Sequence, residues 1–319
     1  MLRYVISRLI AAIPLLLIVS AFVFFFGQFA AGDLAMNLTL QTNGGIFDPE
    51  VYQTLREKLH QDVSPPVRFA RFVAGAVQGD FGVSYVLPGT PDIGRMIVSS
   101  LPISLQLGLV AMLLTVLVGI PLGVVAALTR NSILDHLVVG GTTIFSAMPP
   151  FVLAPILMVV LVVHLGVVPS VGLGWHGIFS TETLFPAAVL AAGPLLGVVR
   201  FTRASVTSTL AHEYVRTARA KGLPERQVLT GHVLRNSLTP VVTTVGIATA
   251  HVISGSIFIE TIFNIRGFGY MAVSAFRAGD VQTVAATTLV SAAIIIVMNL
   301  LVDLTYGLLD PRVRLGADR

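Results

Sequence analysis

The chain has 319 residues, of which 55% are hydrophobic and 11% are charged, and its formal net charge is +4. A soluble domain carries about 25% charged residues, so this chain has too little charge to cover a water-facing surface, and lipid must surround much of it. The absence of cysteine excludes disulfides, thiolate metal sites, a cysteine nucleophile and S-acylation.

The first apolar stretch follows Arg3 and Arg8 and extends from about Leu9 to Ala30. A signal peptide also begins with positive charge, but its apolar part has only about 7–15 residues. This stretch is longer and has no clear A-x-A cleavage site, so we expect a retained membrane helix.

Five further apolar stretches exceed the roughly 20 residues that an α-helix needs to cross a bilayer. Together with the first they predict an all-α membrane protein with six transmembrane helices. Proline residues predict kinks in the second, third and fourth helices, and glycines such as Gly119 and Gly123 permit close helix packing. The five stretches are Leu101–Leu128, Leu137–Val168, Leu184–Val206, Val241–Phe263 and Val284–Leu308.

The distribution of Lys and Arg predicts the orientation. With the N-terminus in the cytoplasm, thirteen of the twenty basic residues fall inside, as the positive-inside rule requires. Both termini are then cytoplasmic. The expected organisation is a cytoplasmic N-terminus and first helix (1–30), an extracytoplasmic cap (31–100), a five-helix core (101–308) with a cytoplasmic loop (207–240), and a cytoplasmic tail (309–319). Within the cap, Val51–Leu59 and Val67–Val77 have helical spacing.

The cytoplasmic loop concentrates its charges in residues 213–226, in a chain of which only 11% is charged. We expect one helix from about Leu210 to Lys221 that ends at Gly222, and a second that starts at Pro224 and ends near Asn236. Small residues beside the glycine, ringed by positive charge, would form a docking surface for another protein. The alternative, a solvated loop that touches anionic lipid, is about equally supported by the spacing alone. The charged side chains of residues 213–226 are Glu213, Arg216, Arg219, Lys221, Glu225 and Arg226.

Motifs throughout the chain resemble those of ABC importer permeases. The loop sequence Tyr214-Val-Arg-Thr-Ala-Arg-Ala-Lys-Gly-Leu223 resembles the EAA loop of this family, and more narrowly its dipeptide/oligopeptide/nickel branch (DppB/OppB-type subunits). Further motifs occur in the family's order. They are Gly79-Asp-Phe-Gly82, Leu101-Pro-Ile-Ser-Leu105, Ser146-Ala-Met-Pro149, Glu260-Thr-Ile-Phe263 with Gly267-Phe-Gly269, Leu301-Val-Asp-Leu-Thr-Tyr306 and Asp310-Pro-Arg312.

The resemblance implies a type I importer permease whose loop couples to a cytoplasmic ATPase. Two departures from the family pattern stand out: Arg216 replaces the first Glu of the broad motif, and Leu59-His-Gln-Asp62 replaces a Leu-Gly-Leu-Asp-like run in the cap. The residues assigned to ATPase coupling by resemblance are Arg216, Thr217, Ala218, Arg219, Ala220, Lys221, Gly222 and Leu223.

The partners implied by the resemblance are a second, homologous permease, two ATPase subunits, an extracytoplasmic substrate-binding protein, a peptide substrate and the lipid bilayer of a prokaryotic cytoplasmic membrane; no nucleic acid is expected. ATP and Mg²⁺ would be bound by the partner subunits and no cofactor or metal by this chain. A nickel chelate or another small solute is the alternative substrate.

Catalytic motifs are missing from the sequence. There is no Gly-x-x-x-x-Gly-Lys-Ser/Thr loop and no Gly-x-Ser-x-Gly elbow. His212-Glu213 begins like a zinc-protease motif, but Arg216 stands where its second histidine is required. We therefore expect no catalytic residue in this chain.

Ionisable groups in the apolar stretches are costly in lipid and need a reason. We expect structural or gating roles for Glu260, which could meet Arg266, and for Asp303, which could meet Arg200 or Arg203, with Asn299 one turn before Asp303. Ser146, Pro149 and His251 are candidate pathway residues, although core packing is the simpler role for His251. A stand-alone carrier driven by an ion gradient through His251, Glu260 and Asp303 is the alternative function.

Overall fold

The computed structural model describes residues 2–87, 89, 91–146, 148–166, 177 and 180–309, and these are almost entirely helical. Within these ranges the only β-type pairing is an isolated bridge between Val83 and Asp92. The predicted all-α class is therefore confirmed. The helices form two compact units, one made of Met1–Pro102 with Tyr270–Ile296 and the other of Ile103–Gly269 with Val297–Arg319.

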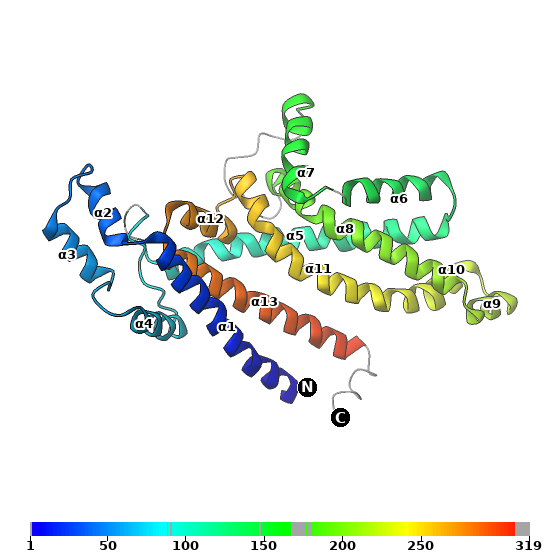
Figure 1. Ribbon diagram of the computed structural model, residues 1–319. Coiled ribbons are helices and arrows are strands. Elements are labelled where there is room, and N and C mark those ends of the chain that lie inside the picture. The colour runs from blue at the N-terminus through cyan, green and yellow to red at the C-terminus, as the bar shows by residue number, and fades with distance from the viewer. Residues whose placement is uncertain are drawn as a thin grey trace. The chain divides into compact units, whose positions relative to one another are not determined.

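The first unit contains the long first helix and the helices of the segment that follows it (Figure 1). The helical patterns predicted at 51–59 and 67–77 are confirmed as α3 and α4, whereas α2 and α12 were not predicted. Asp33 and Asp48 cap α2 and α3 by accepting hydrogen bonds from first-turn N–H groups. The helices are α1 (Leu2–Ala31), α2 (Leu34–Thr42), α3 (Pro49–Lys58), α4 (Pro65–Val77), the start of α5 (Ile93–Leu128), most of α12 (Phe268–Ala278) and the first part of α13 (Val281–Leu309).

Aromatic side chains join the C-terminal end of α1 to α4. The ring of Phe24 lies 5.5 Å from that of Phe69 and 5.6 Å from that of Phe72, measured between centroids. Next to them, Nη2 of Arg68 donates a hydrogen bond of 2.7 Å to Oε1 of Gln28. The segment after α1 thus folds back onto it and is not a free loop.

The departure at Leu59-His-Gln-Asp62 has a local structural consequence. His60 takes a left-handed backbone conformation with φ 53°, at the position where the resembled family has glycine. This conformation is costly for most side chains but is adopted by histidine more often than by bulky residues. The turn between α3 and α4 therefore forms despite the substitution.

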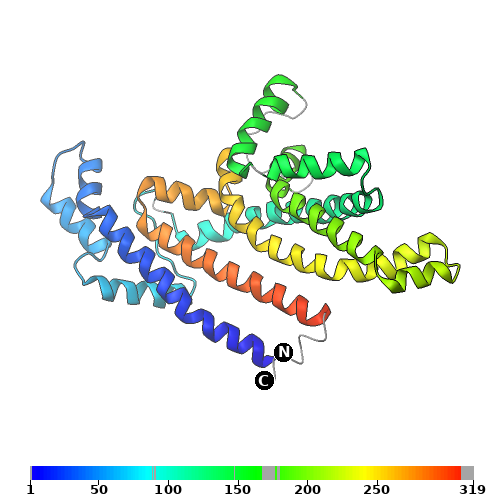
Figure 2. The same ribbon diagram turned by 45° about the vertical axis from the view of Figure 1, so that its right-hand side comes forward.

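The second unit is built around α8 and α11, which run side by side in both ribbon views (Figure 1 and Figure 2). Its core combines buried side chains of α5, α7, α8 and α11, among them Leu107, Ala154, Leu190 and Ile259. The helices of this unit, besides parts of α5, α12 and α13, are α6 (Ile133–Ser146), α7 (Pro150–Leu157), the π-helix η1 (Met158–His164), α8 (Thr181–Leu210), α9 (Glu213–Ala220), α10 (Glu225–Gln227), the π-helix η2 (Val228–Leu234) and α11 (Arg235–Ile262).

Glycine allows α5 and α8 to approach closely, as predicted. A Cβ atom on Gly123 would lie 2.6 Å from the Cβ of Thr202 and 2.7 Å from the carbonyl oxygen of Val199. At Gly119 the nearest atoms would be 3.3 Å away. A side chain at Gly123 would therefore force the two helices apart.

Four helices of the described chain are long and apolar enough to cross a membrane. They are Tyr4–Phe29, Ile93–Leu128, Thr183–Leu210 and Val281–Leu304. The third predicted span, Leu137–Val168, is broken at the prolines that predicted a kink there. The helix breaks after Ser146 and restarts at Pro150, with an angle of 107° between the two parts, because consecutive prolines cannot continue the hydrogen-bond ladder.

The bent pair would count as a fifth span only if its two arms cross the membrane together. The predicted fifth stretch, Val241–Phe263, is helical as part of α11 but is not among the helices that meet these criteria in the described residues. Several of its side chains, and the predicted tail beyond Leu309, lie outside the described part of the chain.

Candidate functional site

The predicted polar loop folds as a sharp corner between α9 and α10, residues 213–227, which we call the α9–α10 corner. Helix α8 ends at Leu210 and α9 begins at Glu213, so the two are separate helices. The expected end of the second helix near Asn236 is wrong, because α10, η2 and α11 follow one another without a break from Glu225 to Ile262. The corner is therefore attached to two long helices, α8 and α11.

A small buried cluster anchors α9 to the rest of the second unit. Val215 and Ala218, one turn apart, are buried together with Val206 of α8, Ala127 of α5 and Val233 of η2. Ala218 is only 5% exposed, so its side chain faces the chain's own core. Of the small residues expected at a partner contact, Ala220 and Gly222 face outward and Ala218 does not.

The end of α9 forms a complete glycine cap. The N–H of Gly222 donates to the carbonyl of Arg219 at 2.9 Å and the N–H of Leu223 donates to the carbonyl of Ala218 at 3.4 Å. This pair of bonds is the Schellman motif, which places the residue after the helix in the left-handed region. Gly222 has φ +79°, and a Cβ built on it would meet no atom of the chain within 4 Å. The space beside Gly222 is thus open.

An exposed ion pair between Arg219 and Glu225 connects α9 to α10 at the corner. Nη2 of Arg219 donates to Oε1 of Glu225 at 2.6 Å, and Nε donates to Oε2 at 3.1 Å. The two-pronged contact with Arg219 lowers the pKa of Glu225 below its usual value. It fixes the last turn of α9 against the first turn of α10, although both side chains are about half exposed.

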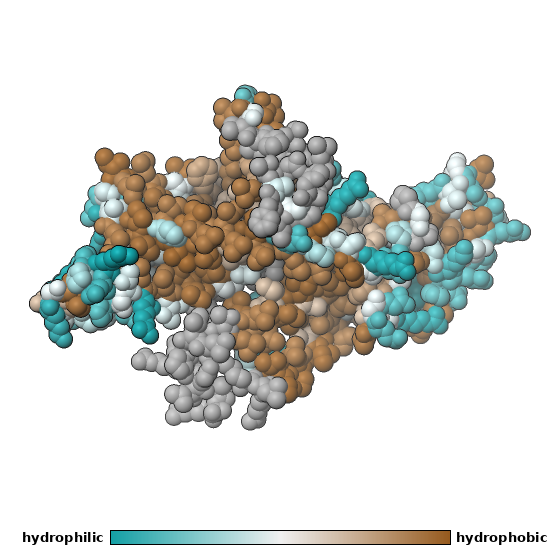
Figure 3. All heavy atoms as spheres, turned by 180° about the vertical axis from the view of Figure 1, so that it is seen from behind, coloured by the Kyte–Doolittle hydropathy of each residue, from teal (hydrophilic) through white to brown (hydrophobic). Residues whose placement is uncertain are grey.

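The outer surface of the corner is polar and mainly positive. Arg216, Thr217, Ala220 and Lys221 are exposed around the open space at Gly222, and Leu223 is 36% exposed. Hydrophilic side chains gather over this end of the second unit, while hydrophobic ones cover the helices next to it (Figure 3). The predicted coupling residues thus lie together, apart from the inward-facing Ala218.

A hydrogen bond connects the two helices that carry the corner. Oγ of Ser205 in α8 donates to the carbonyl oxygen of Ser237 in α11 at 2.8 Å, and Ser237 is fully buried. Tyr214 of α9 also accepts a hydrogen bond of 3.4 Å from Nδ2 of Asn236. The corner, α8 and α11 are therefore joined by hydrogen bonds as well as by the buried cluster.

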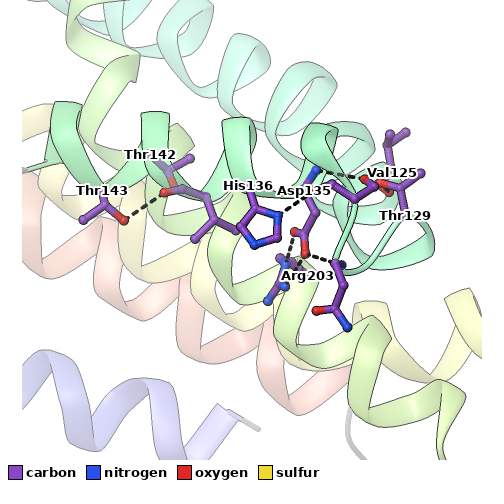
Figure 4. Close-up of polar contacts among 10 residues, drawn as sticks. Val125, Thr129, Asp135, His136, Thr142, Thr143 and Arg203 are labelled. Atoms are coloured by element: carbon purple, nitrogen blue, oxygen red, sulfur yellow. Dashed lines mark hydrogen bonds and ion pairs between the residues drawn. The ribbon is translucent and has the colours of Figure 1, made fainter.

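An ion pair between α6 and α8 was not predicted from the sequence. Oδ1 and Oδ2 of Asp135 accept hydrogen bonds of 2.5 Å and 2.6 Å from Nε and Nη2 of Arg203, and Oδ2 also accepts one of 3.0 Å from the N–H of Asn131 (Figure 4). Asp135 is 3% exposed. Arg203 had been considered as a partner for Asp303; it is instead held by Asp135.

Glu260 lies in the last turn of α11, packed against the connection to α12. It is fully buried, and a Cβ atom on Gly267 would lie 2.5 Å from its Oε2 and 2.6 Å from Oγ of Ser104. The same Ser104 hydroxyl accepts a hydrogen bond of 2.7 Å from the N–H of Phe268. Arg266, its expected partner, is exposed. The family motif around Glu260 therefore describes a place where backbone must approach a buried carboxylate closely.

Of the candidate pathway residues, the structure describes the side chains of Ser146 and Pro149. Ser146 and Pro149 are exposed on either side of the α6–α7 break, and the side chain of His251 lies outside the described ones. Asn299 is exposed on α13 and Asp303 is half-buried one turn later. Among the described residues no group of three or more His, Asp or Glu side chains could hold a metal ion.

Comparison with known proteins identifies the family. Residues 119–315 match the family described as binding-protein-dependent transport system inner membrane component, and residues 1–107 match the corresponding N-terminal component. The oligopeptide transport system permease protein OppB of Haemophilus influenzae is 31% identical over 98% of this chain and 100% of its own length.

Two further relatives come from Bacillus subtilis and Escherichia coli. The dipeptide transport system permease protein DppB of Bacillus subtilis is 33% identical over 99% of both chains. The glutathione transport system permease protein GsiC of Escherichia coli (strain K12) is 35% identical over 98% of this chain and 99% of its own. The matches cover nearly the full length, so they include both units and the α9–α10 corner.

Proposed function

Since the chain belongs to the family of binding-protein-dependent transport system inner membrane components, we propose that it is a membrane subunit of an ATP-driven peptide importer. The named relatives belong to oligopeptide, dipeptide and glutathione transport systems, which favours a peptide over a nickel chelate as substrate. They are permeases, so the chain contributes movement and a pathway, and ATP hydrolysis belongs to partner subunits.

The proposed topology has six membrane crossings with both termini in the cytoplasm. The four helices that satisfy the span criteria, the bent α6–α7 pair and α11 would provide them. The segment containing α2, α3 and α4 then lies on the outer side, and the α9–α10 corner lies in the cytoplasm. The excess of basic residues on the inner side supports this orientation.

The observation that carries the proposal is the exposed, positive and rigidly mounted α9–α10 corner. A partner that binds the corner would move α8 and α11 together, because the buried cluster and the Ser205–Ser237 hydrogen bond join these helices. The residues available to that partner are Arg216, Ala220, Lys221 and Gly222. Nucleotide binding shifts a transporter between states only if the partner binds those states unequally. The corner would transmit that difference to the helices around the pathway, in an alternating-access mechanism.

The proposed assembly contains this chain, a second homologous permease, two cytoplasmic ATPase subunits and an extracytoplasmic binding protein. The competing function is a carrier driven by an ion gradient. It would require ionisable side chains close enough to one another to pass a proton or an ion along the pathway. Glu260 is buried in the last turn of α11, Asp303 lies on α13, and both act as structural or gating groups under the proposal.

Site-directed cross-linking tests the coupling role. The chain has no cysteine, so Ala220→Cys introduces a unique thiol at the exposed face of the corner. We expect this variant, purified with its partners and treated with a bifunctional thiol reagent, to cross-link to an ATPase subunit. Thr54→Cys, which is exposed on α3, should not. Equal cross-linking of both variants, or isolation of the active transporter without any ATPase, would refute the proposal.

A further inference from the structure

A cavity of about 550 Å³ lies within the first unit. It is bounded by the C-terminal end of α1, by α4, by the Asp80–Gly82 turn and by the start of α13 at Val281 and Gln282. Its volume is in the range of about 300–1,000 Å³ that is typical of sites for small molecules. Neither the coupling corner nor the candidate pathway residues contribute to it.

The lining of the cavity combines aromatic and polar side chains. The polar ones include Arg68, Arg71 and Gln28. Such a lining suits a ligand with an apolar part and an anionic part, since aromatic rings and basic side chains are the groups that proteins place where a bilayer meets water. The aromatic lining residues are Phe24, Phe25, Phe29, Phe72 and Phe81.

Arg68 is a half-buried cation of the lining. Its Nη2 donates to Gln28 at 2.7 Å, but its buried Nε has no hydrogen-bond partner among the described residues. Burial lowers the pKa of Arg68, while the charge of Asp62 raises it. Arg68 lines the cavity, so an anionic group bound there would stabilise the charge of its guanidinium.

The acidic groups nearby do not already fill this role. Asp80 lines the cavity, but its Oδ1 accepts a hydrogen bond of 2.8 Å from the N–H of Gly82. Asp62 does not line the cavity and is exposed to solvent. Arg68 and Arg71 therefore outnumber the single acid of the lining, and the cavity favours an anion.

We propose that the cavity binds the phosphate of an anionic phospholipid, with Arg68 as its main ligand and the lipid's apolar part against the phenylalanine rings of the lining. The position supports this class of ligand, because the cavity adjoins the end of Tyr4–Phe29, a helix apolar enough to span the bilayer. A lipid headgroup reaches such a place directly from the membrane. A free phosphate has the same anionic oxygens but would leave the phenylalanine rings of the lining without a partner.

Lipid add-back to the delipidated protein tests the proposal. The chain, purified with its partner subunits in detergent, is titrated with phosphatidylglycerol, with phosphatidylcholine and with inorganic phosphate, and bound lipid is counted by native mass spectrometry while the thermal midpoint is recorded. We expect phosphatidylglycerol to bind and to raise the midpoint. Arg68→Gln should weaken this binding about tenfold or more, as loss of a charged hydrogen bond does.

Arg277→Gln is the matched control, since Arg277 is exposed at the end of α12 in the same unit and does not line the cavity. It should bind phosphatidylglycerol as the unchanged protein does. Equal binding of both lipids, an equal effect of inorganic phosphate alone, or unchanged binding in Arg68→Gln would overturn the proposal. If Arg68→Gln fails to fold, the comparison of the three ligands on the unchanged protein still decides.

Discussion

Replacing Gly222 by tryptophan separates a contact with a partner from a contact within the chain. A Cβ atom at this position meets nothing of the chain within 4 Å, so the new side chain would project into open space. The cost to the chain itself comes from the left-handed backbone, φ +79°, and is about 1–2 kcal/mol for a residue with a Cβ. We expect α9 to stay folded despite this loss of stability, because the buried cluster around Val215 and Ala218 anchors it.

The effect on transport should be much larger than the effect on stability. If an ATPase surface must seat against the corner, an indole ring beside Gly222 blocks it, and we expect peptide-stimulated ATPase activity and uptake to fall by more than about tenfold, which corresponds to about 1.4 kcal/mol of lost docking free energy. The assay compares uptake and ATPase activity in proteoliposomes with the thermal midpoint of the same preparations.

Gly44→Trp supplies the control for backbone strain. Gly44 also has a positive φ, +61°, and also has no atom within 4 Å of a built Cβ, but it lies in the segment between α2 and α3. It should lose similar stability and retain transport. If Gly222→Trp transports as well as Gly44→Trp while both are inserted in the membrane, the corner does not couple to a motor.

Three further predictions concern stability. Asp135→Asn should lower the free energy of unfolding by roughly 2–4 kcal/mol, because it leaves the guanidinium of Arg203 without its charged partner in a partly buried site; chemical denaturation measures this. Gly123→Ala should cost about 1–3 kcal/mol, because its Cβ must push α5 from α8, and thermal unfolding reports it. The α9–α10 corner should loosen in acid: the pKa of Glu225 is lowered by Arg219, so the pair stabilises the folded state above the unfolded-state pKa, and this contribution is lost as the pH falls through the lowered value. Hydrogen exchange of α9 against pH detects the loss.

Each of these has its own control. Adding Arg203→Leu to Asp135→Asn should restore part of the lost stability, and a fully additive double variant would argue against a direct pair. Gly108→Ala should be nearly neutral, since its Cβ would lie 3.6 Å from the nearest atom. Glu225→Gln should abolish the acid dependence of α9, and an unchanged pH profile in that variant would assign the loosening to another group.

The main helices and their lipid environment follow from local sequence pattern. Long apolar stretches with few charges can only be helices in lipid, since every backbone group must be satisfied within the segment, and the stretches that became α1, α5, α8 and α13 were found on that basis. The glycine cap at Gly222 was also predictable, because a local turn with φ above zero selects glycine from its own sequence.

The directions of side chains at the corner needed the tertiary structure. Ala218 and Ala220 are equally small and two residues apart, and only the packing of Val215 and Val233 decides that Ala218 faces inward. The prolines predicted an interruption between Ser146 and Pro150. Whether such prolines kink a helix or end it depends on the groups that surround the carbonyls left without a donor. Local pattern leaves such choices open.

The pairing of charges was decided by tertiary structure alone. Arg203 has several acidic residues that it could meet, and its actual partner, Asp135, is 68 positions away in sequence. Burial of Asp135 requires this pairing, since a carboxylate that is only 3% exposed needs a charged hydrogen-bond donor beside it. Helices come from short-range periodicity, whereas the identity of a buried partner comes from the way in which helices far apart in the sequence are brought side by side.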